Sequence, residues 1–329
     1  MNVRNIPKNF LSDRLLVILS LITFVAMRLV LCDDLLSPAM WAATGIQAVV
    51  ALLLLTLSQS FLVISQRTLL PAFFYLLFAS TSPKYFEEWQ GSLMALLILL
   101  GFYALFATYQ RPKSQVSALN IAILLTLGSF VWTPMLYFFA LFWYGLYRFK
   151  SLNMKTFFAT WMGVLVIYFF IGTWSLFQDD WTIFQSYVPT FDTRWEWNLD
   201  VFSIKEWVVI AYLGFLFLRV GGDIFMSAVS EKIRTATTLG YLYFFALAVF
   251  IFFGMQIQTD YAWRLIIYIP IALLIAHYFT LSENKNSGWL FVLTIAVFVV
   301  ALIDDYVPLN DLLDRSQTGF KTLFENYFN

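Results

Sequence analysis

The sequence predicts an all-α fold, a polytopic transmembrane helix bundle of about 11 spans. Of its 329 residues, 61% are hydrophobic and only 12% are charged, and the mean hydropathy is strongly positive. A soluble protein of this length could not bury so much apolar surface, so lipid must surround most of the chain. No low-complexity segment or clear internal repeat interrupts the apolar runs. We therefore expect a single integral membrane domain, 1–329.

Charged residues and prolines divide the apolar sequence into eleven candidate spans. In chain order these are 15–32, 39–65, 68–82, 91–109, 117–132, 135–148, 156–177, 206–220, 238–257, 264–281 and 287–303. We interpret 117–132 and 135–148 as a tight hairpin around Pro134, because one continuous helix would move the next cations to the opposite side. The run 206–220 is short for a core of roughly 30 Å, whereas 39–65 is long enough to tilt. Such unequal lengths favour a bundle with an open groove.

The charges of the loops orient the bundle with its amino terminus in the cytoplasm. In that orientation thirteen loop Lys and Arg residues lie inside and six lie outside, as the positive-inside rule requires. Sixteen of the twenty carboxylates then lie outside. An odd number of spans makes the carboxyl terminus extracytoplasmic. The expected location is a membrane with the amino terminus on its cytoplasmic side, with membrane lipids as partners and no nucleic acid.

Two outer segments have the pattern of interfacial amphipathic helices. The loop 179–205 is the longest on the outer side and carries seven aromatic residues among its charges. We expect it to lie along the membrane surface as a lid. In the tail 305–329, apolar residues from Phe320 to Phe328 recur at helical spacing on one face.

The most concentrated charge of the membrane region closes the first span. Arg28 lies about one turn inside the apolar run, and Asp33 and Asp34 follow where the run ends. A charged group at membrane depth costs roughly 2.5–3.5 kcal/mol, so it is retained where a partner or a watery cavity receives it. The two carboxylates suit a general base or the ligands of a divalent cation, Mg²⁺ or Mn²⁺. The alternatives are a solvated helix end and an arginine that extends to the headgroups.

Two other outer turns contain charged candidates for binding. Lys84, Glu87 and Glu88 follow the third span, where paired carboxylates would complete an acceptor or metal site; a solvated loop is the alternative. Asp260 and Arg264 precede the tenth span, and a guanidinium there can hold a phosphate in bidentate geometry. The alternative role of Asp260 is to pair with Arg264.

The outer loop 179–205 adds Arg194 and Trp195 as candidates for sugar or phosphate binding. Trp195 offers a stacking face, although aromatic residues at an interface also serve as membrane anchors. A single cysteine, Cys32, excludes an internal disulfide, and a single histidine, His277, excludes a multi-histidine zinc site. The sequence has neither a Walker loop nor a dinucleotide glycine motif.

Two stretches resemble an uncharacterised family of bacterial polytopic inner-membrane proteins. They run from Phe157 to Phe170 and from Lys232 through Pro270 to Phe279. That family brings no established activity, but the resemblance implies a multi-pass location in the bacterial inner (cytoplasmic) membrane. More distantly, the chain is similar to the GT-C superfamily of membrane-embedded glycosyltransferases, which use polyprenyl-phosphate-linked sugars.

The resemblance to the GT-C superfamily implies roles for particular residues. Those enzymes have an acidic residue at the outer end of the first span, which Asp33 or Asp34 matches. They also have outer basic residues that hold the lipid phosphate, which Arg264 or Arg28 matches. The chain departs from them in its first outer loop, from Cys32 to Pro38, which is much shorter than theirs.

Three functions are consistent with the sequence. The first is an inverting glycosyltransferase at the outer face, with Asp33 or Asp34 as the base and Arg264 and Arg28 on a polyprenyl phosphate. Its prenyl chain would lie in the groove beside the short hairpin, under the 179–205 lid. The second is a transporter or flippase of a lipid or lipid-linked glycan. The third is a non-catalytic subunit of a cell-envelope complex, whose outer loops and tail bind protein partners.

Overall fold

The computed structural model describes residues 37–82, 89–188, 204–227, 232–254, 262–281 and 285–306, together with Tyr85 and a few positions between 18 and 26. All regular structure in these ranges is helical, which confirms the all-α fold class. The elements are α3 (Pro38–Ser60), α4 (Leu70–Ala79), α6 (Trp89–Phe106), α7 (Gln115–Ser129), the 3-10 helix η2 (Thr133–Tyr137), α8 (Phe138–Arg148), α9 (Met154–Phe177), α10 (Trp181–Ser186), α11 (Ile204–Ser227), α12 (Ile233–Gly254), α13 (Ala262–Leu281) and α14 (Lys285–Tyr306).

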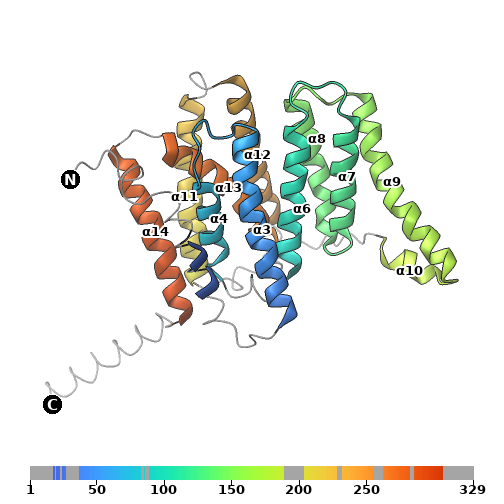
Figure 1. The fold of residues 1–329 in the computed structure, drawn as a ribbon, viewed down its shortest axis with the longest axis horizontal. Helices are drawn as coiled ribbons and strands as arrows, with labels where there is room; N and C mark the ends of the chain where they lie inside the picture. The colour runs from blue at the N-terminus through green and yellow to red at the C-terminus, as the bar shows by residue number, and fades with distance from the viewer. Residues whose placement is uncertain are drawn as a thin grey trace, which may run out of the picture.

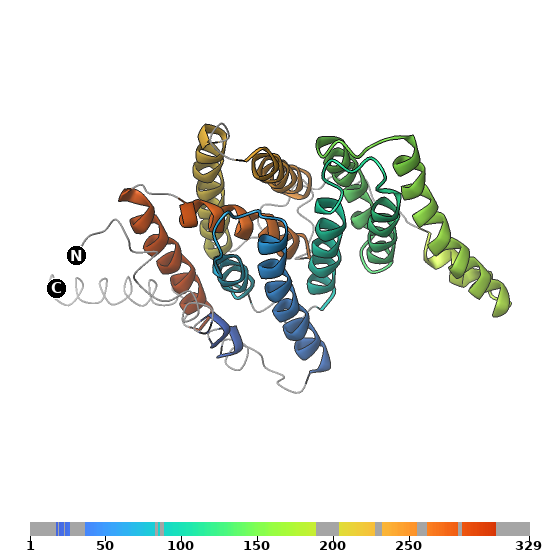
Figure 2. The same ribbon diagram turned by 45° about the horizontal axis from the view of Figure 1, so that its top comes forward.

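The long helices stand beside one another and alternate in direction (Figure 1). α14 forms one edge of the row, and α9 with the short α10 forms the other, in both views (Figures 1 and 2). Helices α3, α6, α8, α11 and α13 all begin at the same end of the bundle. We call this the Arg264 end and the opposite one the Arg148 end. The loop charges predict that the Arg264 end is extracytoplasmic.

Helix α13 forms the centre of the bundle. It packs against α3, α4, α6, α11, α12 and α14, and every residue from Arg264 to Phe279 is buried. Aromatic rings extend this packing, because Phe74 of α4 stacks on Phe279 and Phe78 contacts Phe298 of α14, with ring centroids 5.6 and 4.7 Å apart. Lipid tails are as apolar as these side chains, so close van der Waals contact holds the helices together.

The described helices support a multi-pass membrane protein. Six of them are long and apolar enough to cross a membrane, and three shorter apolar stretches are Leu70–Ala79, Gln115–Ser129 and Ser287–Ala301 within α14. Each predicted run from 39–65 onward coincides with a helix, whereas most of the first run, 15–32, lies outside the described residues. The total of about 11 spans and the orientation of the termini remain predictions.

The predicted length of the second span, 39–65, was wrong. Helix α3 ends at Ser60, and the chain then turns before α4 begins. Leu62 has a φ of 52°, which is outside the range of a right-handed helix, and its carbonyl accepts a hydrogen bond from Thr235 Oγ1 at 3.1 Å. This contact with α12 replaces the helical hydrogen bonds that would have continued α3.

The predicted length of the run 206–220 was also wrong, in the opposite direction. Helix α11 continues through Gly221 and Gly222 to Ser227. Glycine weakens an isolated helix by about 1 kcal/mol, which makes the glycine pair a signal for termination. Here Arg219 and Asp223 form an ion pair at 2.9 Å across that point, one helical turn apart, and support the continuation.

The predicted hairpin around Pro134 is confirmed. α7 and α8 are separate helices joined by η2, which has this proline in its first turn. After α8, a capping box begins α9: the Asn153 side chain accepts from the Thr156 amide at 3.0 Å, and Thr156 Oγ1 accepts from the Asn153 amide at 2.8 Å. Two amides at the start of α9 are thereby satisfied.

Asn153→Ala is expected to lower the free energy of unfolding by about 1 kcal/mol, because it removes the cap of α9. The Asn153 side chain also donates to the Pro112 carbonyl at 2.9 Å, so the change loosens the neighbouring loop as well. Reversible unfolding in mixed micelles, followed by circular dichroism, measures the effect. Asn120→Ala, at an exposed position inside α7, is the control. Equal effects of the two variants would contradict the capping role.

Candidate functional site

A charged pair lies at the Arg264 end, where α11 and α13 begin. Arg264 Nη1 donates to Glu206 Oε1 at 2.7 Å, and the two side chains are only 9% and 15% exposed. Both residues lie at the start of helices that are long and apolar enough to cross a membrane. Removing two charges from water is costly, and the attraction between them offsets that cost only when the geometry is good. The pair therefore fixes α11 against α13.

Two tyrosines lie beside this pair, and a glutamine connects one of them to α3 and α6. The hydroxyls of Tyr85 and Tyr268 lie 3.1 Å apart, and both residues are buried. Gln47 of α3 donates through Nε2 to the Tyr85 carbonyl and to Ser92 Oγ, each at 2.8 Å. The cluster thus joins α3, α6, α11 and α13 at one end of an otherwise apolar bundle.

Tyr85 is held as a neutral hydroxyl. Burial raises the pKa of Tyr85 well above its ordinary value, and the neighbouring Tyr268 raises it further, whereas the Arg264 guanidinium lowers it. Because burial dominates, the phenol keeps its proton at physiological pH. It can therefore donate a hydrogen bond to an anion beside Arg264, but it is not a general base.

An apolar groove lies between α11 and α12, with α13 behind it. Its volume is about 170 Å³, and it is lined by Leu213, Gly214, Phe217, Leu218, Ala246, Leu247, Phe250, Ile267 and Ile271. Ile267 and Ile271 follow Arg264 by three and seven residues, so all three lie on one face of α13. Leu213 stands in the same relation to Glu206 on α11. The lining therefore begins roughly 4.5 Å past Arg264 along α13 and roughly 10 Å past Glu206 along α11.

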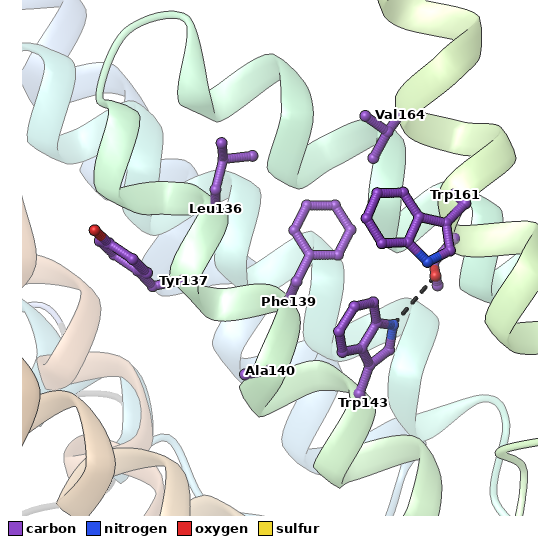
Figure 3. A pocket seen from close by; sticks show the side chains of 8 residues that line it. Leu136, Tyr137, Phe139, Ala140, Trp143, Trp161 and Val164 are labelled. Carbon is purple, nitrogen blue, oxygen red and sulfur yellow. Dashed lines mark hydrogen bonds between the residues drawn. The ribbon is translucent and has the colours of Figure 1, made fainter. Parts of the chain in front are cut away.

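A second apolar groove lies between α8 and α9, beside the short hairpin, as the sequence predicts (Figure 3). Its volume is about 400 Å³, and it is lined by Leu136, Tyr137, Phe139, Ala140, Trp143, Thr160, Trp161 and Val164. At one end Trp143 Nε1 donates to Thr160 Oγ1 at 3.1 Å. It shares no helix with the Arg264–Glu206 pair, whereas α11 and α13 contribute both to that pair and to the α11–α12 groove.

Of the predicted site residues, Arg264 is the one that the structure describes. The others fall outside the described residues; they are Arg28, Asp33, Asp34, Lys84, Glu87, Glu88, Arg194, Trp195 and Asp260. Within the described part of the chain, no group of three or more His, Cys, Asp or Glu residues is placed to hold a metal ion. A divalent cation at Asp33 and Asp34 remains a prediction.

Sequence reasoning missed Glu206, Tyr85 and Tyr268. Asp260, four residues from Arg264, was considered as its ion-pair partner, whereas the described partner is Glu206, 58 residues away in the sequence. A signal was present, because Glu206 and Arg264 each open an apolar span on the same predicted side of the membrane. Two opposite charges in that position favour a contact between their helices.

The described part of the predicted lid, 179–188, does not lie over the Arg264–Glu206 pair. Helix α10 packs on α9, and Trp181 stacks on Phe184 with their ring centroids 4.8 Å apart. Tyr168 of α9 donates to the Tyr187 carbonyl at 3.2 Å. α10 stands at the edge of the row, away from α11 (Figures 1 and 2).

Comparison of the chain with family models, with curated proteins and with solved structures finds no match. The resemblances to the uncharacterised inner-membrane family and to the GT-C superfamily therefore remain predictions. The geometry at the Arg264 end is then the basis for a functional proposal. It consists of a buried guanidinium, a paired carboxylate, neutral hydroxyls and an adjacent apolar groove.

Proposed function

We propose that this chain is a membrane-embedded glycosyltransferase that uses a polyprenyl-phosphate-linked sugar at the extracytoplasmic face of the bacterial inner membrane. The observations that carry the proposal are the buried Arg264 at the start of α13 and the apolar α11–α12 groove, whose lining on α13 begins three residues further along the helix, at Ile267. In this proposal the cation binds the phosphate headgroup of the lipid, and the apolar groove binds its hydrocarbon chain. The guanidinium offers planar, bidentate donors to phosphate oxygens, and it stays charged inside the membrane.

Arg264 would act on the leaving group of the reaction. In the transfer step, the acceptor hydroxyl oxygen attacks C1 of the sugar, and the bond from C1 to the phosphate oxygen breaks. The electron pair leaves with that oxygen, so negative charge grows on the lipid phosphate, where Arg264 and the Tyr85 hydroxyl stabilise it. Attack from the side opposite the phosphate inverts the configuration at C1.

The acceptor proton needs a carboxylate, and Asp33 and Asp34 are the proposed bases. Glu206 has a different role, because its Oε1 accepts from Arg264 and holds that guanidinium at the start of α13. Mg²⁺ or Mn²⁺ held by the two aspartates is the alternative role for that pair. Membrane lipids and the polyprenyl-phosphate carrier are the proposed partners, together with an envelope acceptor.

The proposal is tested by turnover of purified, reconstituted protein with a labelled polyprenyl-phosphate sugar and envelope acceptors. Asp33→Asn or Asp34→Asn is expected to lower the release of polyprenyl phosphate by about 10²-fold or more while the protein stays folded. Retention of the lipid without any turnover would overturn the enzyme and favour a transporter or flippase. Neither turnover nor retention would favour a non-catalytic subunit with protein partners.

A substitution that fills the α11–α12 groove tests lipid binding without disturbing the fold. A Cβ atom added at Gly214 would have no atom within 4 Å, and the same is true of Gly222 in the same helix, outside the groove. Gly214→Leu is expected to raise the KM for the lipid-linked sugar about tenfold, because it occupies space that the prenyl chain needs. Gly222→Leu should leave KM unchanged. Equal KM values for the two variants would exclude this groove as the lipid site.

A further inference from the structure

At the Arg148 end, two loops are joined into one surface. The loop between α6 and α7 and the loop between α8 and α9 share hydrogen bonds from the Gln110 amide to the Phe149 carbonyl at 3.0 Å and from Ser151 Oγ to the Thr108 carbonyl at 2.5 Å. Ser151 and Thr108 are both buried. The bond from Asn153 Nδ2 to the Pro112 carbonyl adds a third connection. The two loops are therefore held in a fixed relation.

All five cations of the segment from Trp89 to Gln178 lie on or beside these two loops, and we call them the basic surface. They are Arg111, Lys113, Arg148, Lys150 and Lys155. The same segment contains no Asp or Glu, so its formal charge is +5. All five side chains are exposed. Asp223, on α11 at the same end, is already bound by Arg219 at 2.9 Å.

The position of the basic surface matches the headgroup region of a bilayer. It connects the ends of α6 and α9, both of which are long and apolar enough to cross a membrane. Exposed apolar side chains begin directly beside it, since Tyr147, Met154 and Phe158 are 67%, 72% and 57% exposed. A lipid would meet the cations with its phosphate while its acyl chains lie against these three residues.

Lys150 occupies a backbone position where glycine is usual. It follows α8 in the left-handed conformation, with a φ of 58°. The Ser151 amide bonds to the Leu146 carbonyl at 2.8 Å and closes the end of the helix. This turn fixes the backbone of Lys150 at the end of α8, and its exposed side chain adds to the four other cations of the basic surface.

We propose that the basic surface is a binding site for the headgroup phosphate of an anionic phospholipid. Lys and Arg beside an anionic membrane surface attract such lipids, and the effect is about fivefold in affinity for each charge. This site stands at the opposite end of the bundle from Arg264 and is independent of the glycosyltransferase proposal.

Native mass spectrometry of the full-length protein, titrated in micelles with phosphatidylglycerol, tests the proposal. Lys150→Gln/Lys155→Gln is expected to raise the Kd of the first bound phosphatidylglycerol at least tenfold. The matched control, Arg67→Gln/Lys232→Gln, removes two exposed cations of the same end that lie outside the two loops, and its Kd should stay within twofold of wild type. Phosphatidylcholine should bind weakly to all three proteins.

Two results would overturn the assignment. Equal losses of affinity for phosphatidylglycerol in the two double variants would show that only the overall charge of this end of the bundle matters. Equal affinities of wild type for phosphatidylglycerol and phosphatidylcholine would show that no anionic headgroup is recognised, and an acidic protein partner would then be the better candidate for the basic surface. Circular dichroism of each variant confirms that the helices are intact before the titration is interpreted.

Discussion

Glu206→Leu is expected to lower the free energy of unfolding by about 3–5 kcal/mol, which is the usual cost of removing one partner of a buried ion pair. The carboxylate lies 2.7 Å from Arg264 Nη1, and both side chains are largely shielded from solvent. An arginine cannot lose its proton in a protein, so the variant keeps a positive charge at the start of α13 without the Glu206 carboxylate.

Arg264→Met should be less damaging than Glu206→Leu. The carboxylate that remains in Arg264→Met can take up a proton and become neutral, whereas the guanidinium that remains in Glu206→Leu cannot. The double variant Glu206→Leu/Arg264→Met should recover most of the lost stability, because it leaves no charge in the apolar surroundings.

A double-mutant cycle of unfolding free energies, measured in mixed micelles, checks both expectations. Single variants within 1 kcal/mol of wild type would mean that water reaches the pair and screens it. A double variant as unstable as Glu206→Leu alone would mean that the geometry of the pair, rather than compensation of charge, fixes α11 against α13.

Gly163→Leu is expected to separate α9 from α7 and to lower the unfolding free energy by about 3 kcal/mol or more. A Cβ atom at Gly163 would lie 2.6 Å from Ala122 Cβ and 2.9 Å from the Leu119 carbonyl oxygen. Neither neighbour is the end of a flexible side chain, so the helices themselves must move. α9 packs chiefly against α7, which makes this close contact decisive for its position.

Gly172→Ala, two and a half turns along the same helix, is the matched control for Gly163→Ala. Its added Cβ would meet only the Phe184 ring, at 3.6 Å, which is an ordinary contact. Replacing glycine by alanine inside a helix favours the helix by up to about 1 kcal/mol, so Gly172→Ala should be neutral or stabilising. Gly163→Ala should cost about 1–3 kcal/mol. Cysteine cross-linking between α7 and α9 reports whether the helices have separated.

The sequence could predict Arg264 as a site residue, because a guanidinium at the start of an apolar span is conspicuous on its own. It could not predict Tyr85 or Tyr268, since buried tyrosines are common in a chain with 17 of them and nothing local distinguishes these two. For Glu206 the sequence carried a signal, since it opens an apolar span on the same predicted side as Arg264. That signal does not identify the partner, because the two residues are 58 positions apart and helix packing decides which spans meet.

The sequence by itself determined the all-α class, the membrane character and the hairpin around Pro134, because hydropathy, helix length and proline act locally along the chain. Only the tertiary structure decided that α3 stops at Ser60 and that α11 passes through Gly221 and Gly222. Those outcomes depend on contacts between residues distant in sequence, or on an ion pair that offsets a weak local propensity. The tertiary structure also decided that Arg264, Glu206, Tyr85 and Tyr268 lie together, because α13 is packed at the centre of the bundle.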